Sequence, residues 1–350
     1  MISQITLKNF RCYNDFSINC KNKLIIFSGK NAVGKTSILE AINIASTTKS
    51  HRTSDIFDVV EDDKNYSLIT IKDDNTNYKI VLSKEGKSYF INGIQEKKAS
   101  SFIGRLKTVL FSPTDIELIN GSKAIRRRFL DLEIAINDKE YLLYASKYKK
   151  VINERNVILK NDNPDIKYLS VITEELIESL RMIYKKRIDF IGILNKELEI
   201  TSKLLKIKNI KIIYQATYNI DDLKKSFNDK LKYDMVTKST NIGTHRDDFL
   251  IYFDDKIAIS YASEGEKRII SIAIKLALAK MIENIYKTKP IVMLDDVYAS
   301  LDKDKIEALS NYVGSFKQTF ITTTSILEIP DVILKDALVI RIEKEKNDGR

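Results

Sequence analysis

The stretch Gly29 to Ser37 reads GKNAVGKTS and matches the pattern G-x-x-x-x-G-K-[ST] of a phosphate-binding loop in full. It follows the apolar run Leu24 to Ser28 (LIIFS), which predicts a buried strand, and it precedes a helical pattern that begins at Lys35. Gly29 and Gly34 allow the backbone to wrap closely around phosphate oxygens, and the helix N-terminus supplies oriented N–H groups. The order of strand, loop and helix predicts a nucleotide-binding site in an α/β fold.

Within this loop, we expect Lys35 to reach the β- and γ-phosphates of ATP and the Thr36 hydroxyl to bind Mg²⁺. The pattern also occurs by chance, so the neighbouring strand and helix carry much of the prediction. The predicted nucleotide-binding residues of the loop are Gly29, Lys30, Asn31, Ala32, Val33, Gly34, Lys35, Thr36 and Ser37.

A second motif, Ile291 to Asp296 (IVMLDD), places two carboxylates after four apolar residues. Such a run predicts a buried strand that carries both acids at its C-terminal edge. There, Asp295 would hold Mg²⁺, directly or through water, and Asp296 would orient or deprotonate an attacking water molecule. Many strands end in Asp, so this motif gains its weight from the loop that precedes it in the chain.

A third motif, Tyr261 to Lys267 (YASEGEK), precedes the long apolar helix expected over Glu266 to Tyr286. In one interpretation, Ser263 and Gly265 form a turn whose hydroxyl and N–H groups bind an anionic ligand. In the other, Ser263 and Glu266 form a capping box, and the residues alone favour this second interpretation.

The rest of the chain separates into regions of different pattern. Residues 65–93 read as short antiparallel strands, and residues after Thr237 return to an α/β pattern with a helix over Lys303 to Val313. We expect helices over Tyr141 to Leu159 and Leu176 to Leu198, joined by the polar turn Asn161 to Asp165. At about 1.5 Å per residue, a hairpin of about 20 residues reaches about 30 Å.

These patterns predict an α/β fold with a parallel or mixed sheet, into which a short antiparallel helical arm is inserted. We place the discontinuous head in residues 1–120 and 235–350, and the arm in residues 121–234.

The composition limits the compartment and suggests a partner. The net charge is +10 and the pI is about 9.2, which favours a polyanion such as nucleic acid, although compositional drift toward Lys explains the charge equally well. Cys12 and Cys20 have no metal-binding or redox spacing. Because no apolar run approaches the roughly 20 residues of a membrane span and the N-terminus has no signal-peptide pattern, we expect a cytoplasmic protein that does not bind membranes.

Together, the loop, the Ser–x–Gly turn, the IVMLDD strand and the following Ser300-Leu301-Asp302 resemble the ABC-type ATPase heads of the SMC group. By itself, the last of these motifs is only a helix N-cap. The resemblance implies that Ser263 and Gly265 belong to a signature motif, which completes the γ-phosphate site of a partner subunit. ATP would then lie between two copies of the chain.

Further stretches narrow the resemblance to the RecF family of bacterial recombination mediators, over Ile5 to about Thr324. The stretch Pro113 to Asp131 (PTDIELINGSKAIRRRFLD) is the most specific of them. The others are KSHRT (49–53), FSP (111–113), NERNVILK (153–160), THRDD (244–248) and TFITTT (319–324).

This resemblance implies an ATP-dependent dimer that clamps gapped DNA or single-strand/double-strand junctions and releases them after slow hydrolysis. It also implies weak DNA-stimulated ATPase activity, the partners RecR and RecO, loading of the RecA recombinase and a role in the SOS response. The chain departs from the family pattern at Val33, Glu264 and Glu266, where Gln is usual, and at Ser300, where an acid is usual. Thr322 to Thr324 stand where other ABC heads have a switch histidine.

Two other functions remain open from the residues. One is an ATP-switched interaction dimer that does not bind DNA, and the other is a P-loop kinase for a small molecule, which the Ser–x–Gly turn and the long arm disfavour.

Several single residues have two interpretations each. His51 and Arg52 belong either to a loop near the nucleotide or the dimer face, or to a solvated loop. The chemistry of His245 to Asp248 is not assigned. Arg126 to Arg128 either bind DNA phosphates, form the surface of a helix start or make an internal ion pair. Arg11 is a further candidate for contact with the nucleotide phosphates.

Overall fold

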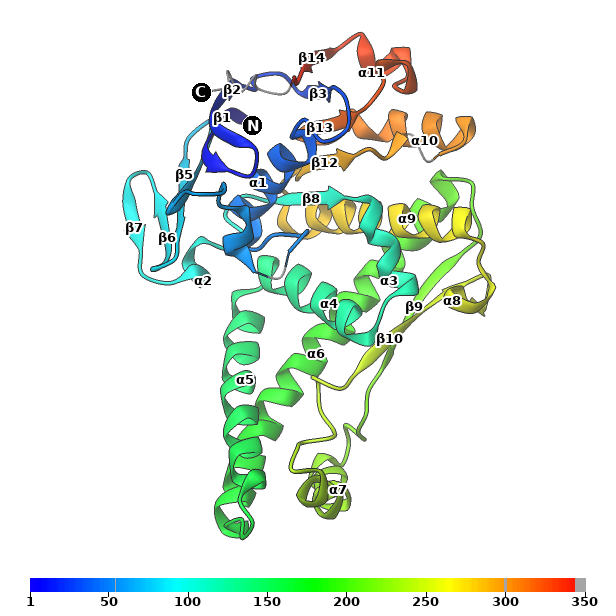
Figure 1. The fold of residues 1–350 in the computed structure, drawn as a ribbon. Helices are drawn as coiled ribbons and strands as arrows, with labels where there is room; N and C mark the ends of the chain where they lie inside the picture. Colours follow the sequence, from blue (N-terminus) through cyan, green and yellow to red (C-terminus); the bar gives the residue numbers. More distant parts are fainter. Residues whose placement is uncertain (54, 299–300, 344–350) are drawn as a thin grey trace. The chain divides into compact units, whose positions relative to one another are not determined.

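The structure is a computed structural model that describes residues 1–53, 55–298 and 301–343 (Figure 1). By its internal contacts, the chain forms two compact units. The first unit comprises Met1–Asp115, Leu204–Ile207 and Ser271–Arg350, and the second comprises Ile116–Lys203 and Lys208–Ile270. Residues 235–270, which we expected in the head, therefore group with the helical unit, and the division into head and arm stays a prediction.

A parallel sheet forms the centre of the first unit. Its five strands lie in the order β14-β3-β13-β12-β8. Their bounds are Leu24–Ser28 for β3, Thr108–Phe111 for β8, Ile291–Asp295 for β12, Gln318–Thr323 for β13 and Ala337–Arg341 for β14. All residues of β3, β8, β12 and β13 are buried, as expected for strands covered on both faces.

The order of this sheet brings the two predicted nucleotide motifs to one edge. Ile321 of β13 pairs with Ile26 of β3 on one side and with Leu294 of β12 on the other, and all three strands are parallel. The loop that follows β3 and the acids that end β12 therefore lie at the same carboxyl edge, where open α/β sheets bind their ligands. Helix α1 (Lys35–Thr47) continues from the loop as predicted.

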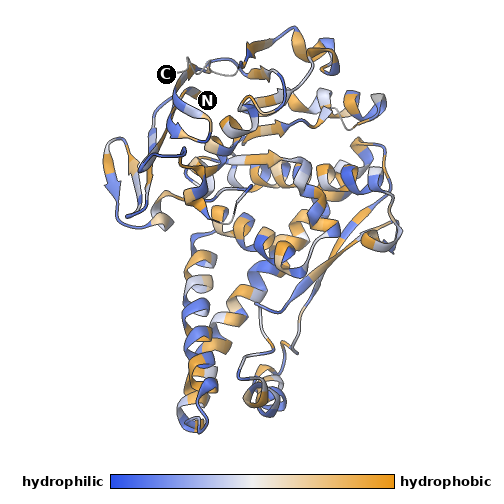
Figure 2. Cartoon of the chain, viewed as in Figure 1, coloured by the Kyte–Doolittle hydropathy of each residue, from blue (hydrophilic) through white to orange (hydrophobic). Residues whose placement is uncertain are grey.

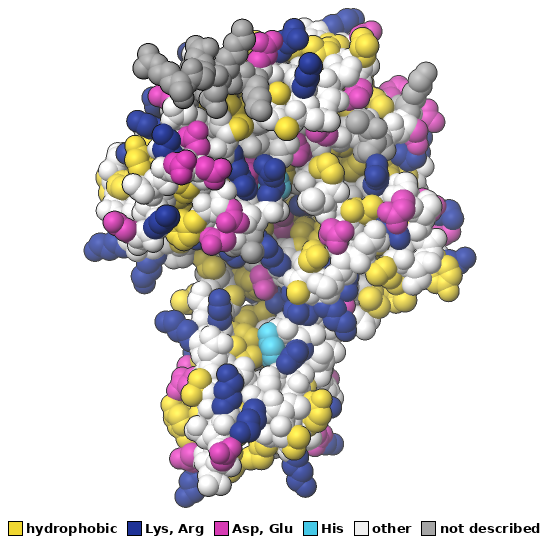
Figure 3. All heavy atoms as spheres, viewed as in Figure 1, with side chains coloured by type: hydrophobic (Ala, Val, Ile, Leu, Met, Phe, Trp, Pro, Cys, Tyr) yellow, Lys and Arg dark blue, Asp and Glu magenta, His cyan; other side chains and the backbone are white. Residues whose placement is uncertain are grey.

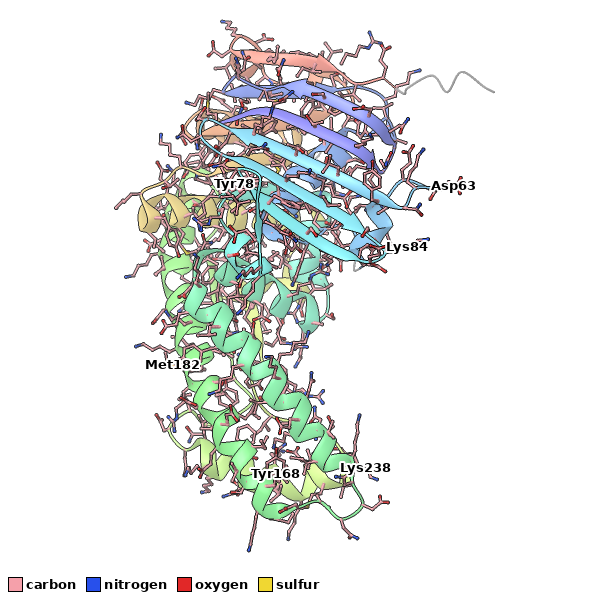
Figure 4. All side chains as sticks on the ribbon, turned by 90° about the vertical axis from the view of Figure 1, so that its left-hand side faces the viewer. Asp63, Tyr78, Lys84, Tyr168, Met182 and Lys238 are labelled. Carbon is pink, nitrogen blue, oxygen red and sulfur yellow. The ribbon has the colours of Figure 1, made fainter. Side chains whose placement is uncertain are left out.

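An antiparallel sheet completes the first unit, with strand order β2-β1-β4-β5-β6-β7. Its strands are β1 (Ile2–Phe10), β2 (Tyr13–Asn19), β4 (Tyr66–Asp73), β5 (Asn77–Ser83), β6 (Gly86–Ile91) and β7 (Ile94–Glu96). The predicted strands within residues 65–93 are confirmed, and Figure 4 shows Tyr78 on β5 and Lys84 near the following turn. Buried Gln318 joins the two sheets, because its side chain bonds the backbone of Ile2 (2.7 Å) at the start of β1.

Three further helices of the first unit are shorter than α1. They are α2 (Ala99–Phe102), α10 (Lys303–Val313) and α11 (Asp331–Leu334). Helix α9 (Glu264–Tyr286) begins among the residues of the second unit and continues among those of the first. The sequence predicted α10 at its observed bounds and α9 to within two residues.

Long helices dominate the second unit. They are α4 (Lys123–Asn137), α5 (Lys139–Lys160), α6 (Ile166–Leu204) and α7 (Leu223–Thr237), with short α3 (Glu117–Asn120) and α8 (Ala258–Tyr261). Hydrophobic and hydrophilic residues alternate along α5 and α6 (Figure 2). The predicted polar turn lies between these two helices, and Figure 4 shows Tyr168 and Lys238 close to it.

Helix α6 corrects the expected length of the hairpin. It has 39 residues, whereas the sequence predicted a helix over Leu176 to Leu198. At 1.5 Å per residue, α6 is about 58 Å long. The buried stripe continues toward the N-terminus through Ile172 and Leu169, but the exposed apolar residues Tyr168 and Val171 next to them obscure it in the sequence.

A three-stranded antiparallel sheet in the second unit was not predicted. It has the order β11-β10-β9, with bounds Ile210–Gln215 for β9, Asp248–Phe253 for β10 and Lys256–Ile257 for β11. In the sequence, the apolar residues Ile210 and Ile212 on either side of Lys211 are the signal for β9, and the structure buries both isoleucines and exposes Lys211. No helix within the described ranges has the length and hydropathy needed to cross a membrane.

Candidate nucleotide-binding site

Two glycines shape the loop between β3 and α1. Gly34 has a φ of 104°, and a Cβ there would lie 2.5 Å from the Tyr13 hydroxyl and 2.7 Å from Cys12 Sγ. A Cβ at Gly29 would lie 2.3 Å from the carbonyl oxygen of Ile342. Both positions therefore require glycine, one for its backbone conformation and both for the close approach of neighbouring atoms.

Lys35 is buried inside the curve of this loop. Its Nζ donates hydrogen bonds of 2.9 Å to the carbonyl oxygens of Gly29 and Lys30. The ammonium group is thus held at the centre of the loop, where the phosphates of a bound nucleotide would lie.

Asp295 joins the two halves of the site. Its Oδ1 accepts hydrogen bonds of 2.8 Å from Thr36 Oγ1 and from Thr322 Oγ1, and the Asp295 side chain is buried. A hydroxyl and a carboxylate in contact are the oxygen ligands that Mg²⁺ takes beside nucleotide phosphates. Within the described part of the chain, no group of three or more His, Cys, Asp or Glu is arranged to hold a metal ion.

Asp296 has an unusual backbone and a perturbed carboxyl. Its φ is 48°, in the left-handed region, and its N–H donates to Thr322 Oγ1 at 2.9 Å. Burial raises the pKa of Asp296, the neighbouring charge of Asp295 raises it further, and Lys35 acts in the opposite direction. A raised pKa makes a carboxylate a stronger base, which suits a group that accepts a proton.

A cavity of about 740 Å³ brings these groups together. This volume lies within the range of about 300–1,000 Å³ that is usual for ligand sites. The lining residues are Arg11, Cys12, Asn31, Ala32, Gly34, Lys35, Thr36, Ser37, Arg52, Asp58, Val60, Asp62 and Asp296. The structure therefore places Arg11 and Arg52 beside the predicted loop and Asp296.

Glu40 of α1 is a residue of this site that the sequence did not single out. Its side chain is fully buried and accepts two hydrogen bonds from Arg11, of 2.7 and 3.0 Å. Arg52 Nη1 lies 3.4 Å from the same carboxylate, and Ser50 Oγ donates to it at 2.5 Å. Burial raises the pKa of Glu40, but the bonds from Arg11 and Ser50 and the charges of both arginines outweigh it and lower the pKa overall. Glu40 thus stays ionised and fixes the arginines beside the cavity.

His51 stands beside this cluster as a neutral side chain. Burial lowers its pKa to about 4, and neither ring nitrogen has a hydrogen-bond partner in the described part of the chain.

The Ser–x–Gly turn forms the capping box that was the alternative interpretation. Ser263 N donates to Glu266 Oε2 at 2.8 Å, and Glu266 N donates to Ser263 Oγ at 3.3 Å. Ser263 Oγ also donates to the Glu266 carboxylate at 2.9 Å, and Ser263 is exposed and Glu266 half-buried at the start of α9. A role of Ser263 and Gly265 toward a partner's nucleotide stays a prediction.

The arginines at 126 and 127 make internal contacts. Arg126 forms a two-fold ion pair with buried Asp248, at 2.7 and 3.0 Å, and Arg127 Nη1 donates to the carbonyl oxygen of Asp247. For Arg126, the structure therefore confirms the internal ion pair.

The Ser300-Leu301-Asp302 motif is only partly described by the structure. Ser300 lies outside the described residues, and Asp302 caps α10 by accepting a hydrogen bond from Lys305 N.

The parallel sheet, the glycine loop and the contact between Thr36 and Asp295 are those of a P-loop ATPase of the ABC type. The sequence profile of the RecF/RecN/SMC N terminal domain matches residues 1–333. The DNA replication and repair protein RecF of Acholeplasma laidlawii is 36% identical over 325 residues, which cover 92% of this chain and 93% of that protein. That of Streptococcus gordonii is 37% identical over 358 residues, covering 97% and 98%. The chain belongs to the RecF family.

Solved structures agree with this assignment. The structure titled "recombination mediator protein RecF-ATP in RecFOR pathway" has a TM-score of 0.90 and 27% identity, and the match covers 98% of this chain and 95% of that one. The Smc head domain of Pyrococcus furiosus matches with a TM-score of 0.55 at 17% identity, over 98% and 94%, and shares the fold. The predicted fold class, an ABC-type ATPase head with a helical arm, is confirmed.

Proposed function

We propose that this protein is an ATP-dependent DNA-binding protein of recombinational repair. The observation that carries the proposal is the bond between Thr36 and Asp295, which joins two nucleotide motifs from opposite ends of the chain at one cavity. The relatives in Acholeplasma laidlawii and Streptococcus gordonii are DNA replication and repair proteins, and a structure similar over 98% of this chain is titled RecF-ATP. These similarities support ATP as the nucleotide and DNA repair as the role.

In this proposal, residues 29–37 hold the phosphates of ATP, and Thr36 and Asp295 hold Mg²⁺. Bound Mg²⁺ would supply positive charge against the charge that develops on the phosphate oxygens. Lys35 binds the β- and γ-phosphates, and Asp296 orients the attacking water and accepts its proton. Asp is one methylene shorter than the Glu that is usual at this position, which suits slow hydrolysis.

The output of ATP binding is a dimer of two heads. Ser263 and Gly265 of one copy would complete the γ-phosphate site of the other, where N–H groups at the start of α9 favour an anion. The dimer clamps DNA, and hydrolysis releases it. Gapped or junction DNA, the partners RecR and RecO, loading of RecA, a role in the SOS response and a cytoplasmic location are what membership of the RecF family implies.

Light scattering with and without ATP and Mg²⁺ tests the central step. We expect a monomer without nucleotide and a dimer with it. An unchanged mass when ATP is bound would contradict the proposal.

A salt titration of DNA binding, with and without ATP, separates this function from an interaction dimer that does not bind DNA. Binding that strengthens with ATP and weakens steeply with salt supports the DNA clamp. Dimerisation without any DNA binding would favour the interaction dimer, and a phosphorylated small-molecule product would favour a kinase.

A further inference from the structure

The second unit carries a group of exposed or half-exposed cations that come from three separate segments. Lys123 and Arg127 lie in the first turns of α4, Lys149 lies in α5, and Arg246 lies in the segment before β10. We call these four residues the basic face. Figure 3 shows Lys and Arg side chains gathered over α4 and α5 on the side in view.

Hydrogen bonds hold two of these segments together. Arg127 Nη1 donates to the carbonyl oxygen of Asp247 at 2.9 Å, which places the first turns of α4 directly against the residue that follows Arg246. Arg246 Nε donates to the carbonyl oxygen of Thr240 at 3.4 Å. Both guanidinium groups are thus positioned by backbone carbonyls rather than by carboxylates.

The third segment joins through one flank of α5. Lys149, Asn153, Asn156 and Lys160 share this flank by their spacing of four, three and four residues. Asn156 Oδ1 accepts from Thr240 N at 2.8 Å, and Lys238 Nζ reaches the carbonyl oxygen of Lys160 at 3.4 Å. The flank that carries Lys149 therefore lies along the same segment that carries Arg246.

The lysines on the two flanks of α5 differ in whether a carboxylate neutralises them. On the flank toward α6, Lys147 pairs with Glu175 and Glu178 at 3.5 and 2.9 Å. On the other flank, Lys149 has no carboxylate partner within ion-pair distance in the described ranges, and the same holds for Lys123, Arg127 and Arg246.

The acids closest in sequence to Arg246 do not neutralise the basic face, because they are buried and used elsewhere. Asp247 accepts from the hydroxyls of Tyr214 (2.5 Å) and Tyr218 (2.8 Å), and Asp248 pairs with Arg126. The side chains that would cancel the charge are turned into the core, while the cations stay at the surface.

We propose that the basic face binds the phosphate backbone of duplex DNA. The proposal rests on the DNA-binding function proposed above and adds the surface that carries it. Backbone contacts of Lys and Arg give affinity without reading sequence. The nearest aromatic residue of α5, Tyr148, is buried and bonded to His245 at 2.8 Å, so the face offers no exposed ring there for stacking unpaired bases. Duplex backbone is therefore favoured over single-stranded bases.

The test is a fluorescence-polarisation titration of the full chain, with ATP and Mg²⁺, against a labelled duplex and a labelled single strand at several salt concentrations. The variant Lys149→Ala/Arg246→Ala removes two cations of the basic face, and both residues lie outside the nucleotide cavity. The control Lys185→Ala/Lys196→Ala removes the same charge from α6, where both lysines are exposed on the side opposite the buried stripe. ATP affinity, measured by calorimetry, should be unchanged in all three proteins.

We expect the basic-face variant to bind duplex roughly tenfold or more weakly, while the control binds like the wild type. The slope of log affinity against log salt should become less steep by about 1.8, since each phosphate contact contributes about 0.9. If the wild type binds duplex and the variant keeps the same affinity and slope, the basic face is not the DNA surface, although the proposed function stands. An equal loss in the control, or a variant that loses only single-strand binding, overturns the assignment too. A wild type that binds no DNA overturns both proposals.

Discussion

The hydroxyl of Thr36 donates a 2.8 Å hydrogen bond to the carboxylate of Asp295, although 259 residues separate the two in the chain. The contact exists because β3 and β12 are parallel and separated by β13 alone, so the loop after β3 and the acids that end β12 meet at one edge of the sheet. It also distinguishes the two acids, since Asp295 bonds the Thr36 hydroxyl and Asp296 lines the cavity.

The acid pair gives the first prediction. Asp296→Asn keeps the size of the side chain but cannot accept a proton, so it should bind ATP and dimerise yet hydrolyse about 100-fold more slowly. Asp295→Asn should instead weaken Mg²⁺-dependent ATP binding roughly tenfold or more. Its Oδ1 can still accept from Thr36 and Thr322, so the fold should persist. Phosphate release and calorimetry with and without Mg²⁺ measure both effects. Wild-type turnover in Asp296→Asn would place the base elsewhere.

Lys35→Ala should abolish hydrolysis or weaken ATP binding, because it removes the ammonium group at the centre of the loop. Lys23→Ala is the matched control, since Lys23 is exposed just before β3 and does not line the cavity. Titration with a fluorescent ATP analogue compares the two variants. If Lys35→Ala binds and hydrolyses ATP like the control, the loop is not the phosphate site.

Most residues of the candidate nucleotide site could be predicted from the sequence because they belong to local motifs. The glycines, Lys35 and the helix after them lie within one short stretch, and the apolar IVMLDD run by itself indicates a buried strand with acids at its end. Glu40 escaped notice because its role depends on Arg11, 29 residues away, and on Arg52 beyond the end of α1. An acid on an otherwise apolar helix face is the signal that would have pointed to a buried partner.

The second unit was harder to predict for a similar reason. Strands β9 and β10 pair across the whole of α7, so neither the pairing nor the register of Phe249 with Tyr214 is encoded locally. The ion pair of Arg126 with Asp248 spans 122 residues, and the sequence therefore left Arg126 open between an internal carboxylate and DNA.

Ser263→Arg should leave ATP binding to the monomer intact and block ATP-dependent dimerisation, because in the proposed dimer Ser263 would contact the nucleotide of the partner. The same change also removes the capping box, at a cost of about 1 kcal/mol. Asp222→Arg controls for this loss, since Asp222 caps α7 in the same way. Light scattering with ATP should show dimers for Asp222→Arg and monomers for Ser263→Arg. If both variants form dimers with ATP, Ser263 only caps α9 and has no role in dimerisation.

His245 should make the folded state less stable in mild acid. Burial lowers its pKa to about 4, and the charge of Arg246 acts in the same direction against the bond to Thr240. The unfolded chain, with a pKa near 6.5, therefore binds the proton more readily, so stability is full above about pH 6.5 and falls as the pH drops toward 4. From pH 7 to pH 5, the loss from this residue is on the order of 1–2 kcal/mol. In urea unfolding, the free energy of unfolding of His245→Asn should fall less between pH 7 and pH 5 than that of the wild type. An equal fall in both proteins would show that His245 is not its cause.

The buried ion pair between Arg155 of α5 and Asp234 of α7 gives the largest expected effect on stability. Their side chains are 1% and 0% exposed, and Arg155 Nη1 lies 2.8 Å from Asp234 Oδ2 and 2.7 Å from Thr240 Oγ1. Arg155→Met leaves the Asp234 charge buried without its counter-charge, which should cost about 3–5 kcal/mol in the free energy of unfolding.

The control for this pair is Lys203→Met, which breaks an ion pair with Glu199 in which both side chains are exposed. That change should cost no more than about 0.5 kcal/mol. The double variant Arg155→Met/Asp234→Leu removes both buried charges and should recover part of the loss, because an apolar pair needs no compensation. Urea unfolding followed by circular dichroism measures all three. If Arg155→Met costs no more than Lys203→Met, or if the double variant is no more stable than Arg155→Met alone, then the loss in Arg155→Met does not come from an uncompensated buried charge.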